Sequence, residues 1–166
     1  TTNNPINTNN PISKSSNLND LIKNLGPEPL KDLTIIKFKE ILKSSNKPVK
    51  LVLMDQEKIA GVGNIYANES LFLAGIDPIR KAKELTNGQM VKLLNCLEKV
   101  LKEGIKWGGA SSNNYVDAYG GKGKMQGHFL VYGKDGQDCP NKCGSEIKRI
   151  KLGGRGTFYC PHCQQI

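Results

Sequence analysis

Four cysteines near the carboxyl end of the chain have the spacing of a metal site. Cys139 and Cys143 are separated by three residues, Cys160 and Cys163 by two, and sixteen residues lie between the two pairs. Two close pairs of thiolates favour Zn²⁺, which binds sulfur tetrahedrally, and four cysteine ligands leave no position open for a reacting water. The pattern predicts one structural zinc ion, with a hairpin between the pairs.

Two other interpretations of these cysteines stay open at this point. They could form two disulfides, although no secretion signal accompanies them. His162 lies inside the second pair and could replace one cysteine as a ligand. The fifth cysteine, Cys96, falls in an apolar helical pattern, so we expect a packed small side chain rather than a reactive thiol.

The segment between the cysteine pairs is basic and rich in glycine. It contains Lys151 and Arg155, and from residue 119 to the carboxyl end eight Lys and Arg residues accompany three Asp and Glu residues. Glycines on both sides of Arg155 allow the backbone to approach a phosphate and leave the guanidinium free to bind two oxygens. We expect the hairpin to bind phosphates; a solvated basic turn is the plainer alternative.

A second candidate anion site precedes an expected helix. Gly61, Gly63 and Asn64 form a glycine turn followed by an amide side chain. Such a turn exposes the first amides of a helix, and these bind anions. Many helices begin this way for structural reasons, so the signal is weak by itself.

Apolar periodicity and turn residues predict the elements that position these groups. Thr86 and Gln89 have the spacing of a capping box at the start of a long helix, and Gly75 is placed to end an earlier one. Helices are expected over 34–43, 64–74 and 86–105, a short apolar segment over 49–55, and β-like runs over 128–132, 147–152 and 157–159.

Composition narrows the class of protein. The 166 residues carry a formal charge of +9, which favours nucleic acid as a partner, with membrane surfaces as the alternative. No apolar run is long enough to span a membrane and no signal peptide is recognisable, so we expect an intracellular protein. A large catalytic fold is unexpected at this length.

The chain divides into four expected parts. Residues 1–24 form a tail rich in Asn, Ser and Thr that we expect to be disordered, and residues 25–107 form a helical domain. Residues 108–127 form a glycine-rich loop, and residues 128–166 form a zinc ribbon. The predicted fold is therefore mainly α with a small β unit.

Several motifs in order resemble the formamidopyrimidine-DNA glycosylases, enzymes that remove oxidised purines from DNA. The resemblance covers roughly residues 24–166, and the long loop places it nearer to the oxidised-purine branch than to the endonuclease VIII branch. The matching stretches are 25–30, 55–56, 59–69, 74–78, 108–109, 115–117, 125–126, 131–133, 153–157 and 160–164.

The resemblance implies that residues 25–107 are a helix-two-turn-helix DNA-binding domain, with the motif itself over residues 49–74. It also implies one structural zinc ion, and double-stranded DNA with an oxidised purine or abasic site as partner. Asn64, after Gly63, would bind a phosphate beside the lesion, and Arg155 would hold phosphates and take part in δ-elimination. Phosphate clamping is the physically safer role for a guanidinium, because its pKa makes it a poor proton donor. Tyr115 and Lys122 are loop candidates over a flipped base. We expect a monomer.

Two departures from the family pattern change the expectation for this chain. The family's nucleophile is an amino-terminal proline on a β-sandwich domain, whereas Pro5 and Pro11 here are internal. The chain alone is therefore expected to hold DNA without cutting it. The first cysteine pair also encloses three residues where the family has two, so we expect a looser turn around Asn141 and Lys142 with zinc still bound.

Three alternatives remain open. The chain could be a stand-alone, non-catalytic DNA-binding or scaffold protein. It could be a generic zinc-ribbon module of transcription or translation, in which case it would show no preference for damaged sites. A ligand-free packing protein is the third, and the cysteine pattern argues against it.

Overall fold

The computed structural model describes residues 23–109 and 124–165, and these form helices and one two-stranded sheet. The expectations for the tail, and for Tyr115 and Lys122, fall mostly or wholly outside the described residues. The elements are α2 (Ile35–Lys43), α3 (Val49–Leu53), α4 (Asn64–Ala74), η1 (Ala82–Glu84), α5 (Asn87–Lys106), η2 (Met125–His128), β1 (Lys148–Leu152) and β2 (Arg155–Tyr159). The predicted class, mainly helical with a small β unit, is confirmed.

The predicted helix ends are present. The Thr34 side chain accepts a hydrogen bond from the Lys37 amide at 3.2 Å, which caps α2. Thr86 and Gln89 form the expected capping box at the start of α5, with bonds of 3.2 and 2.9 Å. Gly75 ends α4 in the left-handed conformation, at φ 72°, where a residue without Cβ avoids a steric penalty.

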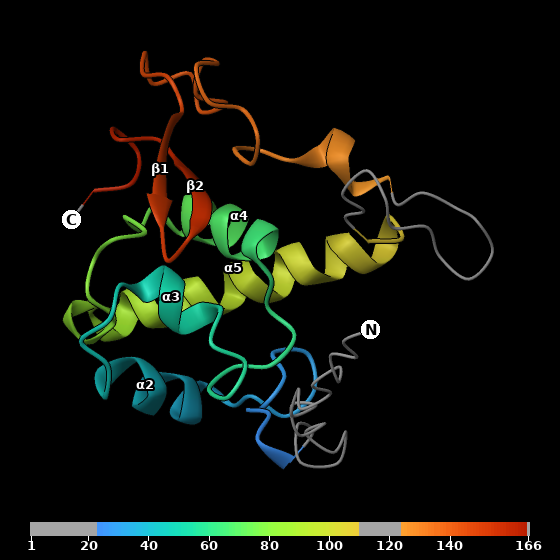
Figure 1. The fold of residues 1–166 in the computed structure, drawn as a ribbon, viewed down its shortest axis with the longest axis vertical. Coiled ribbons are helices and arrows are strands. Elements are labelled where there is room, and N and C mark those ends of the chain that lie inside the picture. Colours follow the sequence, from blue (N-terminus) through green and yellow to red (C-terminus); the bar gives the residue numbers. More distant parts are fainter. Residues whose placement is uncertain (1–22, 110–123, 166) are drawn as a thin grey trace, which may run out of the picture.

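An apolar core lies between the helices. Figure 1 shows α5 as the long helix through the middle of the molecule, with α2 and the β hairpin on opposite sides of it. Leu93 and Leu97 of α5 are fully buried in this core. Cys96 packs partly buried against it, and burial raises the pKa of its thiol, which confirms the expected packing role. In the described part of the chain, no helix is both long and apolar enough to cross a membrane.

The helix-two-turn-helix is formed by α3, a pair of turns and α4. The carbonyl of Asp55 accepts hydrogen bonds from the Lys58 and Ile59 amides at 2.9 and 2.8 Å. The Gln56 side chain accepts from the Gly61 amide and donates to the Val62 carbonyl, both at 2.9 Å. These bonds fix the glycine turn from which α4 begins.

The two strands form an antiparallel hairpin with a two-residue turn. Leu152 pairs with Arg155, and Gly153 and Gly154 between them have φ of 57° and 76°. Positive φ at both positions is typical of the type I′ turn, which suits the twist of a hairpin. Gly153 also packs against α3, because a Cβ there would lie 2.5 Å from a methyl carbon of Leu51.

The strand expected over 128–132 is wrong. Its first residue ends η2, and the residues after Phe129 form bends and a turn. The amides of Leu130, Val131 and Tyr132 donate to the carboxylate of Glu69 on α4, at 2.7, 3.0 and 2.9 Å. A side chain distant in sequence thus takes the donors that a strand would offer to a neighbour.

Candidate metal centre and nucleic-acid interface

The two cysteine pairs converge on one point. The four Sγ atoms lie within 4.8 Å of one another, with Cys139 and Cys163 at 3.8 Å and Cys143 and Cys160 at 3.6 Å. A tetrahedral zinc ion with Zn–S bonds of about 2.3 Å requires sulfur atoms about 3.8 Å apart, so the donor set fits zinc. The group of possible ligands found among the described residues contains the four cysteines and not His162, which is exposed. The chain thus carries one structural zinc site.

The first cysteine pair is spanned by a turn at the place where the longer spacing predicts one. The Lys142 amide donates to the Cys139 carbonyl at 2.8 Å, and Pro140 occupies the second position of this turn. Lys142 itself has φ 54°, a left-handed conformation that is uncommon outside glycine. The additional residue is therefore accommodated in the backbone between the two ligands.

A small apolar cluster surrounds the metal site. It combines Val131, Ile147 and Phe158 of the ribbon with Phe72 of α4, and Cys139 and Cys160 are buried among them. The ribbon's core thus includes a side chain from the helical domain. Packing alone already ties the ribbon to α4.

Several hydrogen bonds between the helical domain and the zinc ribbon lie around one backbone carbonyl, that of Gly156. The Gly156 oxygen accepts from Lys50 Nζ and from Asn64 Nδ2, both at 3.1 Å. Asn68 donates to the Asn64 carbonyl at 2.7 Å and accepts from the Phe158 amide at 2.8 Å. The residue that follows Arg155 is therefore held against the start of α4.

Lys50 belongs to this interface although it was not predicted as a site residue. Its side chain is fully buried, and Nζ also bonds to Thr157 Oγ1 at 2.6 Å. Burial, with a smaller contribution from the nearby charge of Arg155, lowers the pKa of Lys50 to about 8. The only hint was a lysine within a short apolar segment.

Two further buried polar side chains join the ribbon to the helical domain, one from α4 and one that reaches the residues just after α4, and both were also missed. The Glu69 carboxylate accepts the three amides described above and is 1% exposed. Gln164 accepts from the Cys160 amide and donates to the Ile76 carbonyl, both at 2.9 Å. Each depends on a partner far away in sequence, which no local pattern reports.

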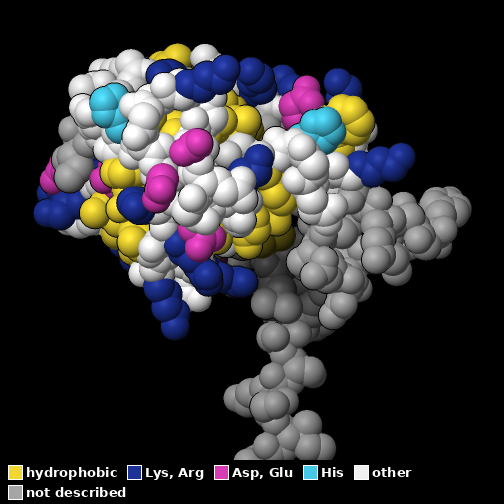
Figure 2. All heavy atoms as spheres, turned by 90° about the horizontal axis from the view of Figure 1, so that it is seen from above, with side chains coloured by type: hydrophobic (Ala, Val, Ile, Leu, Met, Phe, Trp, Pro, Cys, Tyr) yellow, Lys and Arg dark blue, Asp and Glu magenta, His cyan; other side chains and the backbone are white. Residues whose placement is uncertain are grey.

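The predicted anion-binding residues gather around the same carbonyl. Asn64 bonds to Gly156, Lys151 pairs with Gly156 across the hairpin, and Arg155 precedes it. Lys151, Arg155 and Gly63 are exposed. A polar hollow of about 400 Å³ lies on the hairpin, lined by Arg149, Ile150, Lys151, Gly154 and Gly156. Figure 2, viewed from the ribbon end, shows Lys and Arg side chains gathered along one edge of the surface.

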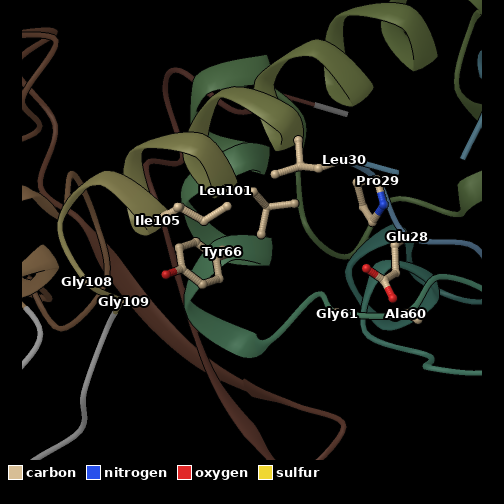
Figure 3. Close-up of a pocket in the computed structure, with 11 residues that line it drawn as sticks. Glu28, Pro29, Leu30, Ala60, Gly61, Tyr66, Leu101, Ile105, Gly108 and Gly109 are labelled. Carbon is tan, nitrogen blue, oxygen red and sulfur yellow. The ribbon is translucent and has the colours of Figure 1, made fainter. Parts of the chain in front are cut away.

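An apolar pocket of about 350 Å³ lies where the glycine-rich loop leaves α5. Leu30, Tyr66, Leu101 and Ile105 line it, as Figure 3 shows, and Gly108 and Gly109 form one end. Tyr66 reaches this position because α5 has a glycine opposite it. A Cβ on Gly104 would lie 2.3 Å from the Tyr66 hydroxyl.

Comparisons with known proteins agree with this geometry. Residues 25–116 match the formamidopyrimidine-DNA glycosylase H2TH domain, and residues 136–166 match a zinc finger found in FPG and IleRS. The formamidopyrimidine-DNA glycosylase of Neisseria meningitidis serogroup A is 44% identical over 146 residues, and that of Gluconobacter oxydans is 45% identical over 148 residues.

Solved structures show the same fold. The MutM (Fpg) protein of Thermus thermophilus is 41% identical, with a TM-score of 0.81 over 87% of this chain and 55% of that one. The Lactococcus lactis Fpg in complex with abasic-site DNA is 43% identical, with a TM-score of 0.79 over 88% of this chain and 54% of that one.

These similarities concern one part of the relatives. Each of the two bacterial sequences is covered over 53% of its length, by 87% of this chain. The chain therefore spans about half the length of the curated relatives it matches.

Proposed function

The chain belongs to the formamidopyrimidine-DNA glycosylase family, and we propose that it supplies the DNA-gripping portion of a base-excision-repair enzyme. The proposed substrate is double-stranded DNA that contains an oxidised purine, such as 8-oxoguanine or a formamidopyrimidine, or an abasic site. For the whole enzyme we propose glycosylase activity followed by β,δ-elimination at the abasic site. For this portion alone we propose DNA binding without strand cleavage.

One observation carries the proposal: the hairpin and the start of α4 meet at the Gly156 carbonyl. Asn64 and Lys50 both bond to this oxygen, so the backbone that carries Arg155 is held against the helix. A rigid pair of donors can hold two phosphates of one strand at a fixed separation, and such contacts set the register of a protein on DNA. The glycine turn before α4 and the basic hairpin, each a weak signal by itself, therefore lie on one surface.

We propose a role for each predicted site residue. Arg155 binds a phosphate at the lesion with both arms of its guanidinium, since bidentate contact suits phosphate oxygens. Asn64 and the amides that follow Gly63 bind a neighbouring phosphate. Lys151 adds charge along the same strand. Tyr115 and Lys122 act in the loop over the flipped base.

Binding to damaged duplexes tests the proposal. We expect zinc-loaded chain to bind a fluorescent duplex with a tetrahydrofuran abasic analogue more tightly than the undamaged duplex, measured by anisotropy. Log affinity should fall with log salt, and Arg155→Ala should reduce that slope by about one, because one phosphate contact is lost. Equal affinity for both duplexes would instead favour a generic zinc-ribbon module.

Borohydride trapping separates gripping from chemistry. A duplex with one 8-oxoguanine should give no covalent adduct with this chain alone, although the same preparation binds the abasic duplex. An adduct would show that an amine of these residues acts as nucleophile, and the division proposed above would be wrong.

The proposed substrate also indicates where the protein acts in the cell. We place it with the nucleoid in a bacterium, or in the nucleus or a DNA-containing organelle in a eukaryote.

A further inference from the structure

The additional residue in the first cysteine pair places an amide side chain against the opposite pair. Asn141 Nδ2 lies 3.4 Å from Cys163 Sγ, within hydrogen-bonding distance of sulfur. We propose that Asn141 is a positioning residue of the zinc site, which donates to the Cys163 thiolate and slows loss of the ion. This role goes beyond ligation by the four cysteines.

The turn that spans the first pair determines where Asn141 points. Pro140 and Asn141 are the two central residues of the turn closed by the Lys142 amide and the Cys139 carbonyl. Proline at the first central position fixes φ and favours this turn. The left-handed conformation of Lys142 then returns the chain to Cys143. With Asn141 at the outer corner, its side chain crosses from one cysteine pair to the other.

The chemistry of the site gives this contact a consequence. Four thiolates around Zn²⁺ leave two net negative charges on the sulfur atoms, and a thiolate can only accept hydrogen bonds. An amide donor stabilises that charge, so the sulfur is less readily protonated, alkylated or released from the metal. Groups that hydrogen-bond to metal ligands commonly contribute about 10-fold to 100-fold in affinity.

The second pair has no equivalent side chain. Pro161 has no N–H and the His162 side chain is exposed, and within the described residues the donors to Cys160 Sγ are backbone amides, those of His162 and of Cys163, the latter at 3.4 Å. Support for the Cys163 sulfur therefore comes from across the site. Asn141 is exposed to water, so its effect should fall at the lower end of the usual range.

Zinc retention tests the proposal without any measurement of enzyme activity. Asn141→Ala should release zinc to a chromophoric chelator about tenfold faster than the unaltered chain, because one donor to sulfur is lost. Asn141→Asp should release it faster still, since a carboxylate repels the thiolate. Lys142→Ala is the matched control, because it alters the same turn without a contact to sulfur, and its rate should be unchanged.

Alkylation mapped by mass spectrometry identifies the sulfur involved. In zinc-loaded Asn141→Ala, N-ethylmaleimide should modify Cys163 faster than in the unaltered chain, with Cys139 unchanged. Circular dichroism at saturating zinc checks that each variant is folded. Equal zinc release from Asn141→Ala and the unaltered chain, or a gain of reactivity at Cys139 in place of Cys163, would overturn the proposal.

Discussion

The helical domain and the zinc ribbon reach a fixed structure by different means. Among the residues that the structure describes, the helical domain buries twenty apolar residues in one cluster. The ribbon's own cluster has six, of which two are cysteines and one, Phe72, comes from α4. About forty residues cannot make an apolar core sufficient for stability, so metal binding must supply much of the ribbon's folding energy. The helices need no such ion.

The difference explains why polar bonds are concentrated where the two parts meet. Lys50, Asn68, Glu69 and Gln164 are each at most 1% exposed, and each bonds to the other part of the molecule. Buried polar groups with a full set of partners specify one arrangement, because any other arrangement leaves them unsatisfied. The ribbon is thereby oriented on α4, and the hairpin with it.

Removal of zinc should have the largest effect and should separate the two parts. We expect a chelator to unfold the ribbon, because zinc binding contributes about 10 to 16 kcal/mol in comparable zinc peptides. The helices should persist, so far-ultraviolet circular dichroism should change little while amide signals of residues 130–165 lose dispersion in NMR spectra. Loss of helix in proportion to zinc would contradict independent stabilisation of the two parts.

Glu69→Gln should have an intermediate effect, confined to the contact between the parts. The amide is nearly isosteric, but it removes the charge from a group that accepts three backbone amides. A hydrogen bond to a charged group contributes roughly 1.5 to 3 kcal/mol to stability. The loss should be smaller than three such bonds, because the glutamine side chain keeps one acceptor oxygen. Hydrogen exchange at Leu130, Val131 and Tyr132 should therefore accelerate. Unaltered protection of these amides in the variant would show that Glu69 does not hold the segment.

The pH dependence of Lys50 should give the smallest effect. Its pKa is lowered to about 8, so between pH 8 and the ordinary lysine value of 10.5 the unfolded chain binds a proton that the folded chain has lost. The contribution to the free energy of unfolding therefore rises with pH across this range. DNA affinity should weaken over the same range, since a positive charge beside Arg155 disappears. Denaturant titrations of the unaltered chain and of Lys50→Met across this pH range check the effect on the free energy of unfolding.

In Lys50→Met the part of the pH dependence that belongs to this lysine should vanish. Lys99→Met is a matched control, because Lys99 is a lysine on α5 whose side chain is exposed rather than buried. A pH profile of Lys50→Met identical to that of the unaltered chain would assign the dependence to another group.

The sequence predicted those features that short-range chemistry determines. The capping box at Thr86 and the stop at Gly75 involve residues within one turn of a helix, and the cysteine spacing reports a ligand set directly. The strand expected at 128–132 was wrong because its amides bond to Glu69, which lies 61 to 63 residues earlier in the chain. Lys50 was missed for the same reason: its partner carbonyl lies in the hairpin.

For the proposed DNA-binding site, the sequence supplied candidate residues but not the contact that joins them. Asn64 and Arg155 were predicted to bind phosphate as separate residues, each on a local glycine pattern. Their link through Gly156 depends on how α4 packs against the ribbon, which neither pattern contains. Asn141 illustrates the intermediate case, because the longer spacing predicted the turn but not the sulfur that its side chain reaches.

A double-mutant cycle at Asn64 and Arg155 tests the central claim, that helix and hairpin form one DNA-binding surface. Affinity for the abasic duplex would be measured for the unaltered zinc-loaded chain, Asn64→Ala, Arg155→Ala and the double variant. We predict that each single change weakens binding and that the two are coupled by about 0.5 to 3 kcal/mol, as for residues in one network. Losses that simply add, or unchanged affinity in Asn64→Ala, would contradict the account.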